Sequence, residues 1–334
     1  MTRRSALLTA LVAAVALGVT ACSSDTPTEP EETSPTAEEP SPEATEDEVV
    51  SITIGALPIS ETAPLWAAID AGVFAEHGLD VTVEAIQGGA LAMPALVNGD
   101  VDFLIGQPYG ALRAHLQDLD VRIIANYASS YAEGDDINGV VSAPGSDISR
   151  PADLAGKRVA VNSLGAAGDL TISAVVAQDG GDPSTIEFVE VAFPDAKAQL
   201  EAGNIDAAWV PQPFLNMIVG AGGTLVTYNY QDTLPGLPTL VIIATGATVN
   251  DDPDLVNRVR DAFSAAFAWA ADNDDAVRQA LVDNLSIPPE GAAALPLPRF
   301  DTTLDVQLIQ DLADLAAEFG FFESAPDVAD IVAQ

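Results

Sequence analysis

The sequence predicts an α/β protein of two three-layer α/β lobes with mixed sheets, joined by two crossing hinge segments. Short apolar strands alternate with helices along two separate stretches, residues 50–105 and 151–210, which is typical of βαβ units. One helix-to-strand motif occurs in both stretches. Hydrophobic residues make up 48% of the chain and charged residues 19%, so the chain can build a large core.

The first stretch predicts strands that pair in parallel. Residues 50–57 alternate apolar and polar side chains and then become fully apolar, as a strand entering a covered sheet does. Pro64 stands in the first turn of a helix that Gly72 ends. A strand over residues 79–86, a helix over 90–98 and a strand over 101–105 follow.

The second stretch repeats this order of elements. A short helical turn over residues 151–156 precedes a strand over 157–161, which runs into the glycine-containing turn 162–168. A helix over 169–177, a strand over 186–191, a helix over 194–202 and a strand over 205–210 follow. The pattern predicts a second α/β unit.

Two segments of these stretches match each other. Leu96-x-x-Gly99-x-x-Asp102 runs to Gln107-Pro108, and Leu200-x-x-Gly203-x-x-Asp206 runs to Gln212-Pro213. In each segment glycine ends a helix, aspartate opens a short apolar strand and Gln-Pro ends that strand. The match indicates two lobes of the same build, although two ordinary helix-to-strand junctions would also produce it.

The carboxyl-terminal part predicts one strand and several helices. The strand covers residues 238–244, and the helices cover about 252–271, 274–284 and 305–319. These helices would pack on the first lobe if the chain crosses back. We therefore expect a discontinuous lobe over residues 49–130 and 240–334, and a continuous lobe over 131–239.

The amino terminus is typical of a bacterial lipoprotein signal. Arg3-Arg4 precede an apolar run from Ala6 to Val19 that is too short for a comfortable membrane span. The run ends in Val19-Thr20-Ala21-Cys22, which resembles the lipobox. We expect residues 1–21 to be removed by general or twin-arginine export, Cys22 to be lipidated, and residues 22–48 to form an acidic, extended linker. A buried free cysteine is the alternative.

The charge of the chain excludes several partners. It has 50 acidic and 12 basic residues and a formal charge of −38, which repels nucleic-acid backbones and anionic lipid headgroups. One cysteine and two histidines leave no disulfide framework and no Cys/His zinc cluster. We expect no nucleic-acid partner, no metal and no cofactor.

The candidate ligand site lies at the carboxyl ends of the predicted strands, where helix amino termini present free N–H groups. The loops that end there cover residues 58–64, 87–90, 106–110, 162–168 and 211–214. Aromatic rings in and near them would give flat walls, and amides and hydroxyls would orient the ligand, although each ring fits a core equally well. The candidate ligand-binding residues are Ser60, Glu61, Trp66, Gly88, Gly89, Gln107, Tyr109, Tyr127, Asn162, Ser163, Gly165, Trp209 and Gln212.

The same loops indicate the charge of the ligand. None of the five loops contains a lysine or arginine. Arg113 and Lys197 lie within predicted helices. We therefore expect a neutral, zwitterionic or weakly cationic ligand, such as a nitrogen heterocycle. Glu61 is the candidate acceptor for an amino group, with a solvated loop carboxylate as the alternative.

Catalysis is not predicted. His77 and His115 fall away from the predicted cleft edge, and the sequence has no Gly-x-Ser-x-Gly elbow, Walker loop or His-Glu-x-x-His motif. Gly88-Gly89 and the turn with Gly165 and Gly168 resemble phosphate-binding loops only loosely, because no Lys-Ser/Thr follows them.

Motifs in a fixed order extend over most of residues 50–245. Pro64 to Val81 has the form P-x-x-x-A-x-x-x-G-x-F-x-x-x-G-L-x-V, and it is followed by Gly99 to Phe103, Asp153 to Val161 and Leu200 to Ala207. This order resembles substrate-binding proteins of ABC importers for nitrate, sulfonates, taurine and thiamine-pyrimidine precursors. The fold of that family is the periplasmic-binding-protein type II fold.

The resemblance implies a lipid-anchored receptor on the extracytoplasmic face of the bacterial cell membrane. Its partners would be a small-molecule ligand and the permease and ATPase subunits of an ABC importer, and we expect a monomer. We favour a pyrimidine or another nitrogen heterocycle as ligand, with a sulfonate, taurine or nitrate as the alternative. The rivals are a pyrimidine-synthase-like enzyme, whose cysteine-rich motif is absent from the mature chain, a surface hydrolase and a lipoprotein interaction module.

Overall fold

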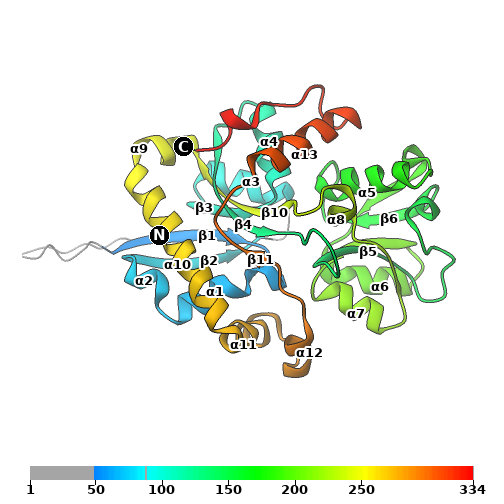
Figure 1. The fold of residues 1–334 in the computed structure, drawn as a ribbon, viewed down its shortest axis with the longest axis horizontal. Coiled ribbons are helices and arrows are strands. Elements are labelled where there is room, and N and C mark those ends of the chain that lie inside the picture. Colours follow the sequence, from blue (N-terminus) through cyan, green and yellow to red (C-terminus); the bar gives the residue numbers. More distant parts are fainter. Residues whose placement is uncertain (1–48, 87–88, 334) are drawn as a thin grey trace, which may run out of the picture. The chain divides into compact units, whose positions relative to one another are not determined.

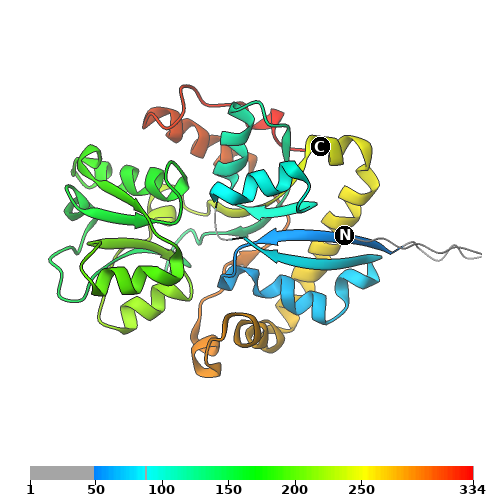
Figure 2. The same cartoon turned by 180° about the vertical axis from the view of Figure 1, so that it is seen from behind.

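Two separate sheets organise the described part of the chain (Figure 1). The structure is a computed structural model that describes residues 49–86 and 89–333. The first sheet has the order β11-β4-β10-β3-β1-β2, and the second has the order β7-β6-β8-β5-β9. Helices cover both faces of each sheet (Figures 1 and 2). The predicted class of two three-layer α/β lobes with mixed sheets is confirmed.

The strands of the two sheets come from different parts of the chain. The first sheet consists of β1 (Val50–Ala56), β2 (Leu79–Ala85), β3 (Phe103–Gly106), β4 (Val121–Ser129), β10 (Pro238–Thr245) and β11 (Arg299–Phe300). The second consists of β5 (Asn138–Ser142), β6 (Arg158–Val161), β7 (Glu187–Glu190), β8 (Ala207–Pro211) and β9 (Thr224–Thr227).

Each sheet has a parallel part that matches the predicted βαβ units. Strand β1 pairs in parallel with β2 and β3, and β6 pairs in parallel with β7 and β8. An antiparallel strand continues each sheet, namely β10 beside β3 and β5 beside β8. The parallel strands of each sheet therefore end at a common edge, which is where ligands bind in such sheets.

The helices include the long predicted one near the carboxyl end. It is α10, which begins after Asp252, whose side chain caps Leu255 N at 3.0 Å. None of the helices within the described residues is both long enough and apolar enough to cross a membrane. The helices are α1 (Ala63–Asp70), α2 (Val73–Glu76), α3 (Gly89–Asn98), α4 (Pro108–Leu116), α5 (Ala167–Gln178), α6 (Ala196–Glu201), α7 (Phe214–Gly220), α8 (Asn229–Thr233), α9 (Gly246–Asp251), α10 (Pro253–Asp272), α11 (Asp274–Leu285), α12 (Pro289–Ala294) and α13 (Val306–Glu318).

The chain passes between the sheets twice, from β4 into β5 and from α8 into β10. The two crossing segments lie side by side, since Ser130 N donates to Leu237 O at 2.9 Å. Gln231 Nε2 also donates to Tyr131 O at 3.0 Å. These are the predicted crossing segments, and a few residues in them would absorb any rotation of one sheet relative to the other.

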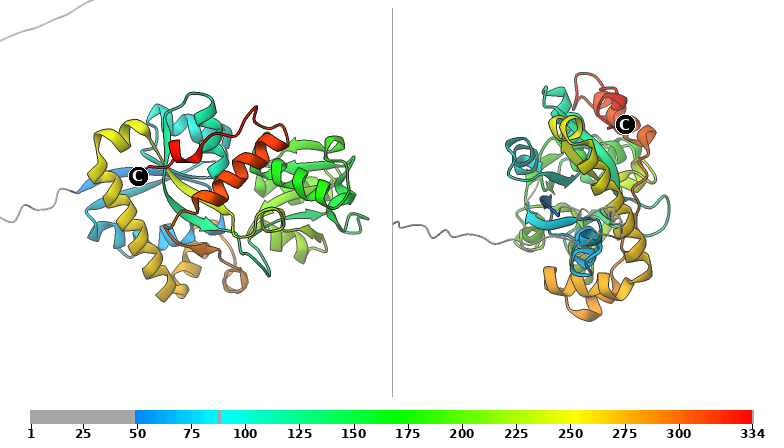
Figure 3. Two further views of the ribbon diagram at one scale, coloured as in Figure 1. Left: turned by 45° about the horizontal axis from the view of Figure 1, so that its top comes forward. Right: turned by 90° about the vertical axis from the view of Figure 1, so that its left-hand side faces the viewer.

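The carboxyl-terminal segment returns to the first sheet. Helix α13 packs against α4, and the last described residues pair with β4 (Figure 3). Ile123 N donates to Ile331 O at 2.8 Å, and Ala333 N donates to Ile123 O at 2.9 Å. The last described residues therefore add backbone hydrogen bonds to β4 of the first sheet.

The matching motifs of the sequence have the same geometry in both sheets. Asp102 Oδ2 accepts from Thr53 N of β1 at 2.7 Å, and Asp206 Oδ2 accepts from Arg158 N of β6 at 2.8 Å. Gly99 and Gly203 both have positive φ, at 77° and 69°, which favours glycine. Each aspartate thus directly precedes its own strand and bonds to the backbone of the neighbouring parallel strand, so the sequence match reflects one local structure built twice.

Several sequence-based expectations fall outside the described residues. They are the signal over residues 1–21, the lipidated Cys22, the linker over 22–48 and Gly88.

Candidate ligand-binding cleft

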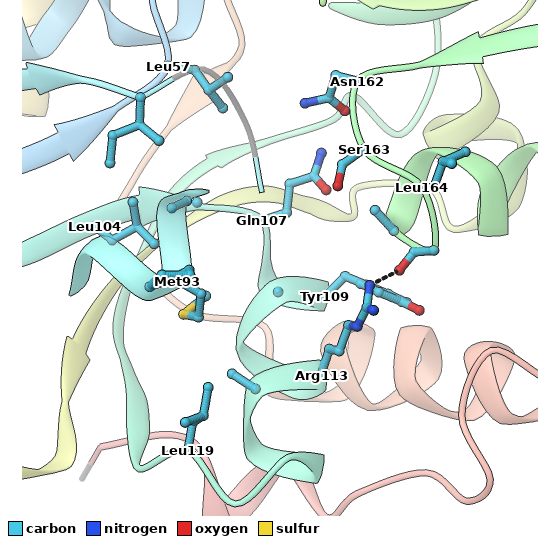
Figure 4. A pocket seen from close by; sticks show the side chains of 18 of the residues that line it. Leu57, Met93, Leu104, Gln107, Tyr109, Arg113, Leu119, Asn162, Ser163 and Leu164 are labelled. Carbon is cyan, nitrogen blue, oxygen red and sulfur yellow. Dashed lines mark hydrogen bonds between the residues drawn. The ribbon is translucent and has the colours of Figure 1, made fainter. Parts of the chain in front are cut away.

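A cavity of 360 Å³ lies where the carboxyl ends of parallel strands from both sheets meet. On the first sheet it is lined by residues at or just after the ends of β1, β2 and β3, among them Leu57 and Ile86. On the second sheet it is lined by Asn162 after β6 and by Glu190, the last residue of β7. Figure 4 shows Gln107 of the first sheet and Asn162 and Ser163 of the second across this space. The volume is that of a small organic molecule.

The walls of the cavity are largely apolar. Leu57, Leu104 and Met93 of α3 lie along one side (Figure 4). Tyr109 of α4 adds a ring that stacks on Phe322 with the centroids 4.9 Å apart. Burial raises the pKa of Tyr109, and the charge of Asp169 adds to this rise. The phenol therefore stays neutral and offers a flat wall.

Gln107 connects the two sheets at the cavity. It is the residue before α4, and its Nε2 donates to the hydroxyl of Tyr230 in α8 at 3.0 Å. Burial, followed by the charge of Asp169, raises the pKa of Tyr230 well above its usual value. Tyr230 therefore remains an uncharged hydroxyl that can both accept this bond and donate another.

The glycine-containing turn 162–168 forms the second-sheet wall. Gly165 has φ of 64°, and at Gly168 an added Cβ would lie 2.8 Å from Cε3 of Trp209. Both positions therefore favour glycine for a physical reason. Two N–H groups of the turn are paired within the protein instead of with a phosphate. The carboxylate of Asp169 accepts from Gly165 N at 2.6 Å and from Ala166 N at 2.7 Å.

Arg113 also lines the cavity, which corrects the expectation that no basic residue reaches the cleft. Its Nη1 donates to Gly165 O at 2.9 Å, so it links α4 of the first sheet with the turn of the second (Figure 4). The loops alone hold no cation, but Arg113 follows Tyr109 by four residues on a helix. Residues spaced by four lie on the same helix face, and this spacing is the signal that the loop-based prediction missed.

Ser60 and Glu61 lie beside Gln212 at a direct contact between the sheets, which we call the seam. Ser60 N and Oγ both donate to Gln212 O, at 3.2 and 3.0 Å, and Ser60 Oγ also lies 3.0 Å from Glu61 Oε2. Glu61 is only 2% exposed. Neither reading of Glu61, as a ligand acceptor or as a solvated carboxylate, matches this burial, and none of the three residues lines the cavity.

The seam has an unusual electrostatic environment because it buries two carboxyl groups. Burial raises the pKa of Glu61 to about 7, and the charge of Asp136 adds to the rise while hydrogen bonds oppose it. Burial also raises the pKa of Asp136, which accepts from Ser130 Oγ and from Tyr131 N. Two buried carboxyl groups that interact favour the protonated form.

The remaining sequence-predicted residues divide between cavity and core. Five of the predicted residues line the cavity, namely Gln107, Tyr109, Asn162, Ser163 and Gly165. Tyr127 and Trp209 are buried in aromatic clusters, and Tyr127 donates its hydroxyl to Glu61 O at 2.9 Å. Trp66 is half-buried in α1, and Gly89 begins α3.

The cavity has few groups for catalysis. No histidine, cysteine or lysine of the described residues lines it. His77 ends α2 and His115 lies in the last turn of α4. Over residues 49–86 and 89–333, no group of three or more His, Cys, Asp or Glu side chains is placed to hold a metal ion.

Comparison with known proteins gives consistent matches. The family model described as NMT1/THI5 like matches residues 59–277. The formylaminopyrimidine-binding protein of Halalkalibacterium halodurans is 24% identical over 71% of each chain, and the taurine-binding periplasmic protein of Escherichia coli is 27% identical over 58% of each chain.

Solved structures match the fold over most of the chain. The alkanesulfonate-binding protein SsuA from Xanthomonas axonopodis pv. citri, bound to MOPS, matches with a TM-score of 0.73 and 19% identity, over 85% of this chain and 98% of its own. The desulfurization enzyme DSZB matches with a TM-score of 0.63 and 17% identity, over 85% and 96%. The same fold therefore carries both binding proteins and an enzyme.

Proposed function

The chain belongs to the NMT1/THI5-like family, and on this premise we propose that it is the extracytoplasmic substrate-binding component of an ABC importer. The ordered sequence motifs predicted this membership. The observation that carries the proposal is the cavity lined by strand ends of both sheets. A ligand that touches both sides favours the arrangement in which the sides are close, so binding shifts the protein toward its closed form.

Two lobes would perform this closure. We assign residues 49–130 and 240–334 to one lobe and 131–239 to the other, because these ranges divide the strands almost as the two sheets do. The crossing segments beside Ser130 and Leu237 would then be the hinge. The permease and ATPase subunits of the importer would recognise the closed form.

A lipid anchor on Cys22 would hold the receptor at the outer face of the cell membrane. The support is the sequence Val19-Thr20-Ala21-Cys22 after an apolar run. The acidic linker over residues 22–48 would keep the folded part away from the anionic headgroups. Replacement of Cys22 by Ala should release the receptor from membranes into the soluble fraction, as immunoblotting would show, and membrane retention of the variant would contradict the anchor.

The ligand is proposed to be a small organic solute. The apolar walls with Leu57, Met93 and Tyr109 suit a flat or aliphatic body, and Gln107, Asn162 and Ser163 are placed to orient polar groups. The names of the relatives indicate two ligand classes, a pyrimidine and an amino sulfonate. We keep a pyrimidine or a similar heterocycle as the proposed ligand, with a sulfonate, taurine or nitrate as the alternative.

A binding role is favoured over an enzymatic one by the absence of a nucleophile and base pair among the described residues that line the cavity. The test is a thermal shift assay of the mature protein with pyrimidines, flavins, amino acids, sulfonates and nitrate, followed by chromatography of each mixture. We expect one class to raise the melting temperature by several degrees, as saturating ligand does, with the ligand recovered unchanged. Product formation would favour the enzyme, and silence across the panel would contradict a receptor for these solutes.

A further inference from the structure

Arg113 is the one basic side chain among the described residues that line the cavity. No ion pair joins it to a carboxylate of the described residues, and its only hydrogen bond there is the one from Nη1 to Gly165 O. A guanidinium has five N–H donors in a planar fork that fits carboxylates and sulfonates. Most of these donors are therefore available at the cavity.

A carboxylate of the protein already lies at the start of α5. The N–H groups of Gly165 and Ala166, the two residues before α5, donate to the carboxylate of Asp169 at 2.6 and 2.7 Å. This carboxylate would repel a second anion. Helix α4 begins with Pro108, which removes one of the four unpaired N–H groups at its amino terminus. Within the described lining, Arg113 is the one side chain whose full positive charge can compensate the charge of an acid.

Glu190 gives the cavity a negative end opposite the positive charge of Arg113. It lies at the end of β7, on the second-sheet side, and its carboxylate accepts from Leu164 N at 3.4 Å. An acidic ligand group would be repelled from Glu190 and attracted by Arg113. A ligand would therefore place its acid toward α4 and any amino group toward β7.

On the basis of the proposed receptor function, we propose that Arg113 determines specificity by selecting organic acids, either carboxylates or sulfonates. The apolar body of the acid lies against Leu57, Met93 and Tyr109. This class differs from the neutral heterocycle expected from the loops, and the reason is the helical position of Arg113. The heterocyclic body stays compatible with it when the ring carries an acid.

Arg113 also couples recognition to closure. Its bond to Gly165 O already joins the two sides of the cavity. At Gly165 an added Cβ would lie 3.2 Å from Arg113 Nη1, so the turn and the guanidinium are in close contact. An acid that bonds to the remaining donors of Arg113 and also touches the turn 162–168 makes both contacts only when the two sides are near each other. Acid binding therefore stabilises the closed form.

The test uses matched probe pairs that differ by the acid alone. Calorimetry measures the affinity of the mature protein for orotate against uracil and for butanesulfonate against butanol, which separates carboxylate from sulfonate sources. The variants are Arg113→Gln and Arg113→Lys, and Lys197→Gln serves as a control that removes a positive charge on α6, away from the cavity. Melting by circular dichroism checks that each variant folds.

We expect at least one acid to bind the wild type about tenfold to hundredfold more tightly than its neutral partner, as a charge-assisted bidentate contact gives. Arg113→Gln should remove that preference by weakening the acid about tenfold to hundredfold more than its neutral partner, Arg113→Lys should keep part of the preference, and Lys197→Gln should keep all of it. If Arg113→Gln does not fold, the wild-type pairs and Arg113→Lys decide.

Three outcomes would overturn the proposal. Equal affinity of the wild type for acid and neutral probes would do so while the receptor function stands. Equal loss of acid and neutral binding in Arg113→Gln would reduce Arg113 to a structural link. Failure of all four probes to bind the wild type would count against the acid specificity, and the broader thermal shift panel would then decide the receptor function separately.

Discussion

The two sheets approach each other in two places, and polar groups are buried in one place and line a cavity in the other. At the seam, Ser60 and Glu61 contact Gln212 directly and are almost completely buried. At the cavity, Ser163, Arg113 and Glu190 line open space. Buried polar groups need protein partners, whereas groups beside a cavity can keep their capacity for a ligand. The comparison shows that position at a strand end does not by itself decide whether a polar group faces the cavity, and that burial separates the two places.

The largest expected difference between the two places is in the pH dependence of stability. The raised pKa of Glu61, about 7 against an ordinary 4.5, means that the folded protein binds this proton more tightly than the unfolded chain. The contribution of this proton to the free energy of unfolding is fully present below pH 4.5 and is lost as the pH rises toward 7. Relative to Glu61→Gln, the free energy of unfolding of the wild type should fall by on the order of 3 kcal/mol over this range.

Urea denaturation between pH 4.5 and 7.5 measures this effect. Parallel stability curves for the wild type and Glu61→Gln would show that the seam does not hold a protonated carboxyl group.

A smaller effect tests how firmly the cavity wall is supported. An alanine at Gly168 would place its Cβ 2.8 Å from the ring of Trp209, and such overpacking costs about 1–3 kcal/mol. Gly220, the last residue of α7, has open space around it, so Gly220→Ala should stabilise the protein by about 0.5 kcal/mol through helix propensity. Thermal denaturation of both variants measures the difference, and equal melting temperatures would mean that the turn yields easily.

The smallest expected effect compares two serines. Ser60→Ala removes the bonds to Gln212 O and Glu61 Oε2 and should lower the free energy of unfolding by about 1 kcal/mol. Ser163, which forms no side-chain hydrogen bond with another described residue, should leave stability unchanged on replacement by alanine and should weaken ligand binding. The opposite result, a stability loss only in Ser163→Ala, would reverse the comparison.

The sequence predicted much of the fold because its strands and helix ends carry local signals. The alternation in β1 and β2 and the Asp252-Pro253 start of α10 correspond to the observed elements. Strand β4 gave no such signal, since it is buried along nearly its whole length and has no polar face. Short strands such as β11 depend on partners distant in the chain.

The candidate site was predictable where a loop alone decides the position of a residue. Asn162 and Ser163 follow β6 directly and therefore line the cavity. Arg113 was missed because it extends from a helix. Ser60 and Gln212 also follow strands, but their contact depends on how closely the sheets approach each other, and local sequence does not contain this information.

The bond between Ser130 N and Leu237 O has a consequence for movement. This bond ties the two crossing segments to each other, so both segments can bend about one shared axis. If the proposed lobes rotate about this line, the bond is kept, whereas sliding of one crossing segment along the other would break it. A pair of spectroscopic labels placed on opposite sides of the cavity mouth would report such a rotation as a change in one distance.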